Sequence, residues 1–179
     1  MAEILVDSVK IPAGVQVELS GSEVRVSGSG KSGSRHFRST DVHLKRDGSN
    51  LEVWAASGRR NIRAEAKSIA THIHNMLNGL GKPYEYRLEI VYSHFPINAS
   101  VKQGYVEISN VGGAKHPKKA RILGETKVEI KGKDIIVKGH DKEAAGQSAA
   151  NMEQRTRIKG KDMRVFQDGI YITQKPKRN

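Results

Sequence analysis

The sequence predicts an α+β fold made of two tandem copies of a small, mostly antiparallel sheet, each packed against one helix. Three observations lead to this fold class. Many short segments alternate apolar and polar residues, which is the pattern of half-buried strands. Two longer segments place apolar residues at steps of three and four, as amphipathic helices do. The order of four strands, a helix and a strand occurs twice along the 179 residues.

The first copy occupies the N-terminal half of the chain. Its alternating segments form two predicted hairpins, at residues 15–19, 24–26, 42–44 and 51–54. A stripe of Ile, Ala, Met and Leu then predicts a helix, with Asn61 as its N-cap and Gly79 as its C-terminal stop. The alternating segment 84–90 is predicted to close this copy as its last strand.

The second copy repeats this order. Its alternating segments predict two more hairpins, at residues 99–101, 105–108, 127–130 and 134–137. Asp141 is a favourable N-cap for a helix that runs to about Gln154, and a strand at 170–173 follows. We place the boundary near Phe95–Pro96, which gives an N-terminal α+β domain at 1–95 and a C-terminal α+β domain at 96–179. Domains this small are expected to pack on each other or on a partner.

Positive charge is concentrated in the C-terminal half. The chain has a formal net charge of +12, and residues 96–179 hold 18 Lys and Arg against 9 Asp and Glu. Residues 1–95 hold 13 against 10. This balance suits a polyanion as partner and makes the C-terminal domain the candidate that binds it. The near-neutral N-terminal domain is compatible with a protein-facing role.

Several function classes are disfavoured by composition. We expect no membrane span, because no apolar run is long enough, and no secretory signal is evident. The absence of cysteine excludes disulfides and thiolate metal sites. The seven histidines have no spacing that suggests a metal site or a catalytic base, so we expect no metal and no cofactor. Three Phe and one Trp argue against broad stacking on single-stranded bases.

The densest positive run is QRTRIKGKDMRVFQDGIYITQK, residues 154–175. Cations anchored to a folded strand can hold phosphates at fixed positions. The candidate RNA contacts in and after this run are Arg155, Arg157, Lys159, Gly160, Lys161, Arg164, Lys175, Lys177 and Arg178. Asp168–Gly169 is predicted to form a turn. The alternative for the whole run is a solvated basic loop.

A second basic cluster lies at 112–121, where Gly and Pro predict a loop. Its candidate contacts are Lys115, His116, Lys118, Lys119 and Arg121. An ordinary Lys-rich loop is the alternative. Gly112, Gly113 and Gly160 would let the backbone approach RNA closely, because glycine lacks a Cβ.

The C-terminal run also resembles a known family. The residues that carry the resemblance are Gln154, Ile158, Lys161, Arg164, Phe166, Asp168 to Ile172, and Lys175. They are similar to the C-terminal signature of the L-six family of universal large-subunit ribosomal proteins, in its archaeal and eukaryotic branch. Weaker matches at 10–15 and 137–142 extend the resemblance over essentially the whole chain. Of the Tyr-Lys-Gly-Lys-Gly run usual in the bacterial branch, only Lys159–Gly160–Lys161 is present.

The resemblance implies a noncatalytic, structural component of the large ribosomal subunit in the cytoplasm. It implies that the second domain grips large-subunit ribosomal RNA near the sarcin–ricin region. It further implies neighbouring ribosomal proteins at the stalk base, with elongation-factor GTPases docking nearby. The cations of the run are the residues implied to contact RNA, whereas strand alternation suggests packing or turn roles for most of Phe166, Gly169, Ile170 and Tyr171.

Two alternatives from other classes remain open on the sequence. One is a nonribosomal RNA-binding or RNA-chaperone module. The other is an enzyme that uses the loop Gly28–Ser32 on a phosphorylated substrate. That loop fails the phosphate-loop template, because Arg25 stands where the first glycine is needed and a strand rather than a helix is predicted next. We therefore interpret it as a flexible connection between strands.

Overall fold

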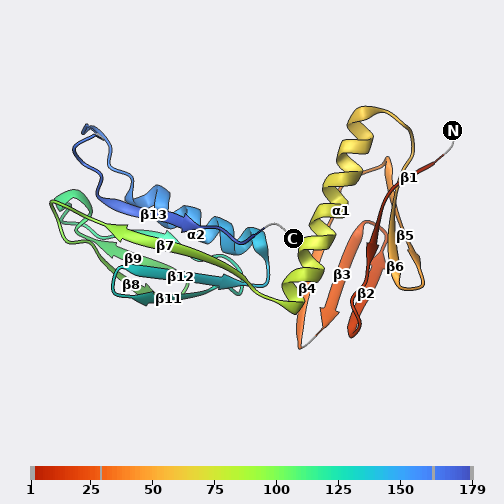
Figure 1. Cartoon of the computed structure of the whole chain (residues 1–179), viewed down its shortest axis with the longest axis horizontal. Helices are drawn as coiled ribbons and strands as arrows, with labels where there is room; N and C mark the ends of the chain where they lie inside the picture. Colours follow the sequence, from red (N-terminus) through yellow and green to blue (C-terminus); the bar gives the residue numbers. More distant parts are fainter. Residues whose placement is uncertain (1–2, 29, 163, 178–179) are drawn as a thin grey trace. The chain divides into compact units, whose positions relative to one another are not determined.

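A computed structural model of the chain describes residues 3–28, 30–162 and 164–177. The chain divides into two compact units, Met1–Lys82 and Pro83–Asn179 (Figure 1). Each unit has its own hydrophobic core, formed by one helix and by antiparallel strands. The predicted α+β class, with two tandem units of sheet and helix, is confirmed.

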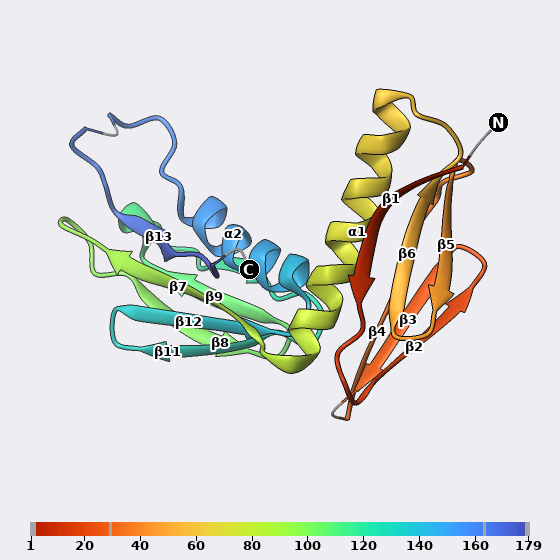
Figure 2. The same ribbon diagram turned by 45° about the vertical axis from the view of Figure 1, so that its right-hand side comes forward.

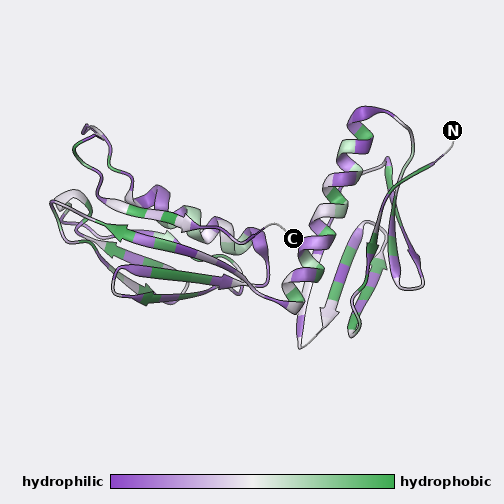
Figure 3. Ribbon diagram, viewed as in Figure 1, coloured by the Kyte–Doolittle hydropathy of each residue, from purple (hydrophilic) through white to green (hydrophobic). Residues whose placement is uncertain are grey.

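In its described residues, the first unit has six strands followed by one helix. The strands are β1 (Ile4–Lys10), β2 (Val15–Ser20), β3 (Glu23–Gly28), β4 (Lys31–His36), β5 (Val42–Asp47) and β6 (Asn50–Ala55). They form two three-stranded antiparallel sheets, with the orders β1-β6-β5 and β2-β3-β4. Apolar residues alternate with polar ones along β2, β3 and β6, as the colours of Figure 3 show, and the apolar ones pack beneath the helix.

Helix α1 (Arg60–Gly81) covers this core. The predicted apolar stripe is buried, at Ile62, Ala66, Ile69, Ile73 and Leu77 among others. The prediction of Asn61 as N-cap is wrong. The N-cap is Arg59, whose backbone is still extended (ψ 140°), and the chain is already helical at Arg60. No side chain caps this end.

The part of the second unit that the structure describes has seven strands, one short 3-10 helix and one α-helix. In chain order they are β7 (Tyr84–Val91), β8 (Asn98–Lys102), β9 (Tyr105–Ser109), η1 (Val111–Gly113), β10 (Lys118–Arg121), β11 (Lys127–Lys131), β12 (Asp134–Gly139), α2 (Lys142–Thr156) and β13 (Gly169–Gln174). One sheet has the order β11-β12-β7-β13 and the other β10-β9-β8, with all pairs antiparallel. Figure 2 shows α2 lying along the strands of this unit. Asp141 caps α2 as predicted, accepting a hydrogen bond from the Glu143 amide at 2.8 Å.

The strand predicted to close the first copy belongs instead to the second unit. β7 lies between β12 and β13, and Leu88 pairs in register with Ile135 on one side and Ile172 on the other. The chain therefore divides after Lys82 rather than near Phe95–Pro96. Alternation within 84–91 shows that one face is buried, but it cannot show which core that face meets.

Strands β1, β4 and β10 do not follow from alternation. β4 has no large apolar residue, and β10 buries only Ala120. β1 starts with an apolar run and has an irregular register between Leu5 and Asp7. In each case backbone pairing with a neighbouring strand fixes a conformation that the side chains alone do not signal. Neither helix in the described part of the chain is long and apolar enough to cross a membrane.

Candidate nucleic-acid interface

The two basic clusters of the sequence meet around one hollow in the second unit. Its volume is about 700 Å³. It is lined by Val111, Gly112, Pro117, Lys118, Lys119, Gln154, Arg155, Arg157, Ile158, Lys159 and Lys161. We call this the basic hollow. Six of the lining residues are Lys or Arg, and none is an acid. All six were candidates on the sequence.

Packing between α2 and β10 brings the clusters together. Asn151 on α2 donates a hydrogen bond to the Arg121 carbonyl at 2.9 Å, and Ser148 Oγ accepts one from the Leu123 amide at 2.9 Å. On the other side, Ile158 lies against Gly112, where a Cβ would come within 3.4 Å of its Cδ1 atom. The cations of both clusters are therefore carried by segments anchored in one core, not by free loops.

Thr156 connects the two ends of the loop that carries the basic run. Its hydroxyl donates one hydrogen bond shared between the Met152 and Glu153 carbonyls, at 3.1 and 3.0 Å, and accepts one from the Ile170 amide at 3.0 Å. This joins the end of α2 to the start of β13. Asp162, the first of the two acids in the run, accepts a hydrogen bond from the Arg164 amide at 2.9 Å. The side chain of Asp162 therefore shapes a turn.

Asp168 ties the same loop to the end of β7. Its carboxylate is buried and accepts hydrogen bonds from the amides of Ser93, His94 and Phe95 at 2.8, 3.3 and 3.3 Å. Burial alone would raise the pKa of Asp168, but these amide hydrogen bonds and the nearby His94 ring hold it below its usual value. The predicted turn at Asp168–Gly169 is wrong: residue 168 leads directly into β13 as a buried anchor.

Aromatic rings orient two of the six cations. Lys161 Nζ lies 4.4 Å from the centroid of the Phe166 ring and 6.0 Å from that of Phe95. Lys119 Nζ lies 5.1 Å from the Tyr105 centroid. These contacts hold the ammonium groups without neutralising them. Within the described ranges, none of the six cations of the basic hollow forms an ion pair. A compact, uncompensated positive surface of this kind attracts phosphates.

Two of the three glycines expected to admit RNA serve internal packing. Gly112 and Gly113 have positive φ angles of 60° and 78°, which favour glycine. A Cβ at Gly113 would come 3.2 Å from the Phe95 ring. Gly160 also has a positive φ, 74°, but nothing lies within 4 Å of its Cβ position, so it remains open to an approaching backbone.

The packing at Gly113 gives a first prediction. We expect Gly113→Ala to destabilise the second unit by about 1–2 kcal/mol through the left-handed backbone alone, and further through displacement of Phe95. Gly132→Ala is the matched control, because Gly132 has a φ of 61° and open space around its Cβ position. Urea unfolding should rank Gly113→Ala as the less stable variant. Equal losses would show that the contact with Phe95 contributes nothing.

The other candidate contacts do not line the basic hollow. These are Lys115, His116, Arg121, Gly160, Arg164, Lys175 and Lys177. Lys175 and Lys177 follow the far end of β13, roughly 20 Å of extended chain from Gly169. Arg178 lies outside the described residues.

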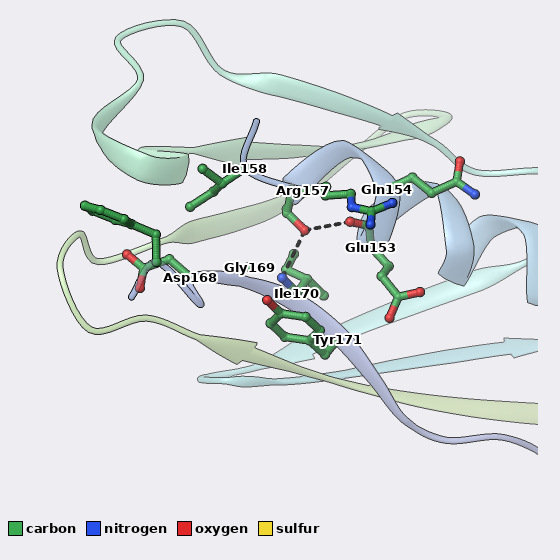
Figure 4. Close-up of a pocket in the computed structure, with 10 residues that line it drawn as sticks. Glu153, Gln154, Arg157, Ile158, Asp168, Gly169, Ile170 and Tyr171 are labelled. Carbon is green, nitrogen blue, oxygen red and sulfur yellow. Dashed lines mark hydrogen bonds between the residues drawn. The ribbon is translucent and has the colours of Figure 1, made fainter. Parts of the chain in front are cut away.

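Sequence reasoning missed a second cavity beside the basic hollow. Its volume is about 350 Å³. It is lined by Glu153, Gln154, Thr156, Arg157, Ile158, Phe166, Asp168, Gly169, Ile170 and Tyr171 (Figure 4). Gln154, Arg157 and Ile158 line both spaces. The available signal was that Phe166 and Tyr171 both stand in the run that carries the family resemblance.

The described ends of the segment 28–32 belong to two paired antiparallel strands. Gly28, the last residue of β3, pairs in register with Lys31, the first residue of β4. No helix N-terminus stands next to it, since α1 begins at Arg60. The geometry of a phosphate-binding loop is therefore missing here. Nowhere in the described ranges do three His, Asp or Glu side chains cluster as metal ligands would.

Comparison with known proteins agrees with this geometry. The sequence model of the family "Ribosomal protein L6" matches residues 95–169, which include every residue that lines the basic hollow. The chain is 43% identical over 175 residues to "Large ribosomal subunit protein uL6" of Methanothrix thermoacetophila, covering 98% of this chain and 99% of the relative. It is 42% identical over 168 residues to the protein of that name from Thermoplasma acidophilum, covering 94% of each. The chain belongs to the uL6 family of large ribosomal subunit proteins.

Proposed function

We propose that the chain is a structural, noncatalytic constituent of the large ribosomal subunit, and that it binds large-subunit ribosomal RNA through the basic hollow. The observation that supports this most directly is the convergence, from two separate segments, of six cations that form no ion pair with any described residue. Each cation that neutralises a phosphate releases condensed counterions, which favours binding regardless of sequence. The family membership agrees with this assignment.

Recognition in this proposal rests on the shape and backbone of the RNA. The six cations are spread over two walls of the basic hollow, so they can contact phosphates on both sides of a turn or groove. Side chains cannot read the deep major groove of A-form RNA, so phosphates and 2′-hydroxyls are the accessible features. The open Gly160 lets the RNA backbone come close to the protein backbone.

The finer location is also part of the proposal. We infer that the second unit binds near the sarcin–ricin region and that the protein lies at the stalk base, close to where elongation-factor GTPases dock. The first unit has a weaker charge bias, with 12 Lys and Arg against 8 Asp and Glu in residues 1–82. This supports a role facing neighbouring ribosomal proteins. Crosslinking of the full chain in purified subunits tests both inferences, and crosslinks confined to other regions would contradict them.

The assignment of RNA binding to the second unit has a direct test. We expect Lys159→Gln with Lys161→Gln to weaken binding of the full chain to large-subunit rRNA far more than Arg35→Gln with Arg38→Gln. Both pairs remove two positive charges, but only the first lies in the basic hollow. Filter binding at several salt concentrations measures the difference. Equal effects would contradict the assignment.

A further inference from the structure

The second cavity borders the basic hollow. Arg157 and Ile158 line both, so a ligand in one space lies against residues that also line the other. The two spaces differ in chemistry. Six cations line the basic hollow. The second cavity is lined by apolar and aromatic residues, and Arg157 is the one cation among the described residues that line it. A ligand that fills both must carry a charged part and a flat, less polar part.

The aromatic wall is a rigid platform. Tyr171 is 40% exposed, and its hydroxyl donates a hydrogen bond to the Gln167 carbonyl at 2.9 Å. Its ring lies against Gly169, where an added Cβ would come 3.4 Å from the ring. Phe166 also has contacts within the protein: the His94 ring lies 4.7 Å from it, centroid to centroid, and Lys161 Nζ lies 4.4 Å from its centroid. Figure 4 shows Tyr171 beside Gly169 and Ile170 at the start of β13.

Polar groups at the cavity match the edge of a nucleobase. Glu153 Oε1 accepts a hydrogen bond from the Ile172 amide at 3.2 Å, which fixes this carboxylate at the cavity. A carboxylate accepts hydrogen bonds from ring or amino N–H groups of a base, and Arg157 can stack on a base or contact its phosphate. The volume of about 350 Å³ lies at the lower end of the range for small-molecule sites, roughly 300–1,000 Å³.

We propose that this second cavity holds one unpaired nucleobase of the RNA whose phosphates occupy the basic hollow. The inference rests on the proposed function and makes it more specific. The RNA partner must present a splayed-out nucleotide, from a bulge, a loop or a helix end, next to the phosphates that the six cations bind. Arg157 stands between the two subsites and holds the phosphate at the splayed nucleotide, while Tyr171 stacks on its base.

The experiment is chemical probing of large-subunit rRNA bound to the full chain. Hydroxyl-radical cleavage reports contacts to the backbone, and base-modifying reagents report exposed Watson–Crick edges. The wild-type protein is expected to protect a backbone segment and one unpaired base beside it. Tyr171→Ala is expected to keep the backbone protection and to lose the base protection, with rRNA affinity falling about fivefold to a hundredfold. Tyr171→Phe keeps the ring and should behave as wild type.

The possible outcomes distinguish the claim of a base site from the claim of rRNA binding. Backbone protection without any base whose reactivity depends on Tyr171 would overturn the base site and leave the proposed function standing. Loss of all protection with the wild-type protein would overturn both. Tyr171→Leu covers the case in which the alanine variant fails to fold, because leucine fills the space without an aromatic face. Base protection retained in a folded Tyr171→Leu variant would also overturn the proposal.

Discussion

Full-length protein in which all six cations of the basic hollow are replaced by glutamine is expected to lose about a thousandfold or more in affinity for large-subunit rRNA at low salt. The hollow gathers Lys118, Lys119, Arg155, Arg157, Lys159 and Lys161. If each neutralises one phosphate, the slope of log K against log salt becomes shallower by about 4 to 5. The measurement is a salt titration of rRNA binding, with circular dichroism to verify the fold.

Replacing the six cations two at a time makes this prediction more specific. The pair 118/119 comes from one segment and the pairs 155/157 and 159/161 from the other, yet each pair should reduce the slope by roughly 1.5 to 2. The matched control is Lys127→Gln with Lys131→Gln, two exposed cations on β11 of the same unit and outside the hollow. If this control reduced the slope as much as any pair, net charge alone would explain binding, and the basic hollow would have no special role.

Asp168→Asn is expected to destabilise the second unit by about 1–3 kcal/mol at neutral pH. The carboxylate accepts hydrogen bonds from three consecutive amides at the end of β7, and it is buried. Asparagine keeps one acceptor oxygen and places an NH₂ donor against the remaining amides, which leaves donors unsatisfied. A loss of this size is a large fraction of the stability of a small domain, about 5–15 kcal/mol. Urea unfolding followed by circular dichroism measures it.

The effect of Asp168 should depend on pH with a defined sign. Its pKa is lowered in the folded state, so the contribution of the carboxylate to stability is complete above the unfolded pKa, about 3.9. It is lost as the pH falls below that value toward the folded pKa. The stability gap between wild type and Asp168→Asn should therefore be full at pH 7 and shrink as the pH falls below about 4. Asp134→Asn, an exposed position at the start of β12, is the control. A gap that stayed constant with pH would contradict the anchoring role of the charged carboxylate.

Local sequence patterns were sufficient for most elements of this fold but not for the partners of those elements. Alternation identified both hairpins of each unit, and the apolar stripe identified α1. The same pattern placed β7 in the wrong unit, because periodicity reveals a buried face and not the core that buries it. β4 and β10 could not be found, since backbone pairing rather than side-chain burial defines them.

The candidate interface could also be predicted only in part from the sequence. Charge density alone identified the six cations, since Lys and Arg runs are visible in any sequence. Their convergence depends on α2 packing against β10, which buries small residues such as Ala145 and Ala149 that carry little signal. The role of Asp168 also depends on a distant segment. Asp168 contacts amides more than 70 positions earlier in the chain, and no local pattern marks such a contact.

The most direct test of the central claim is sucrose-gradient sedimentation of native extract before and after a high-salt wash, with detection of this protein. We predict stoichiometric retention on the large subunit through the wash, because a structural constituent is held by several surfaces at once. Absence from the large subunit, or complete loss at mild salt, would contradict the account. That result would favour a nonribosomal module that binds structured RNA through the same basic hollow.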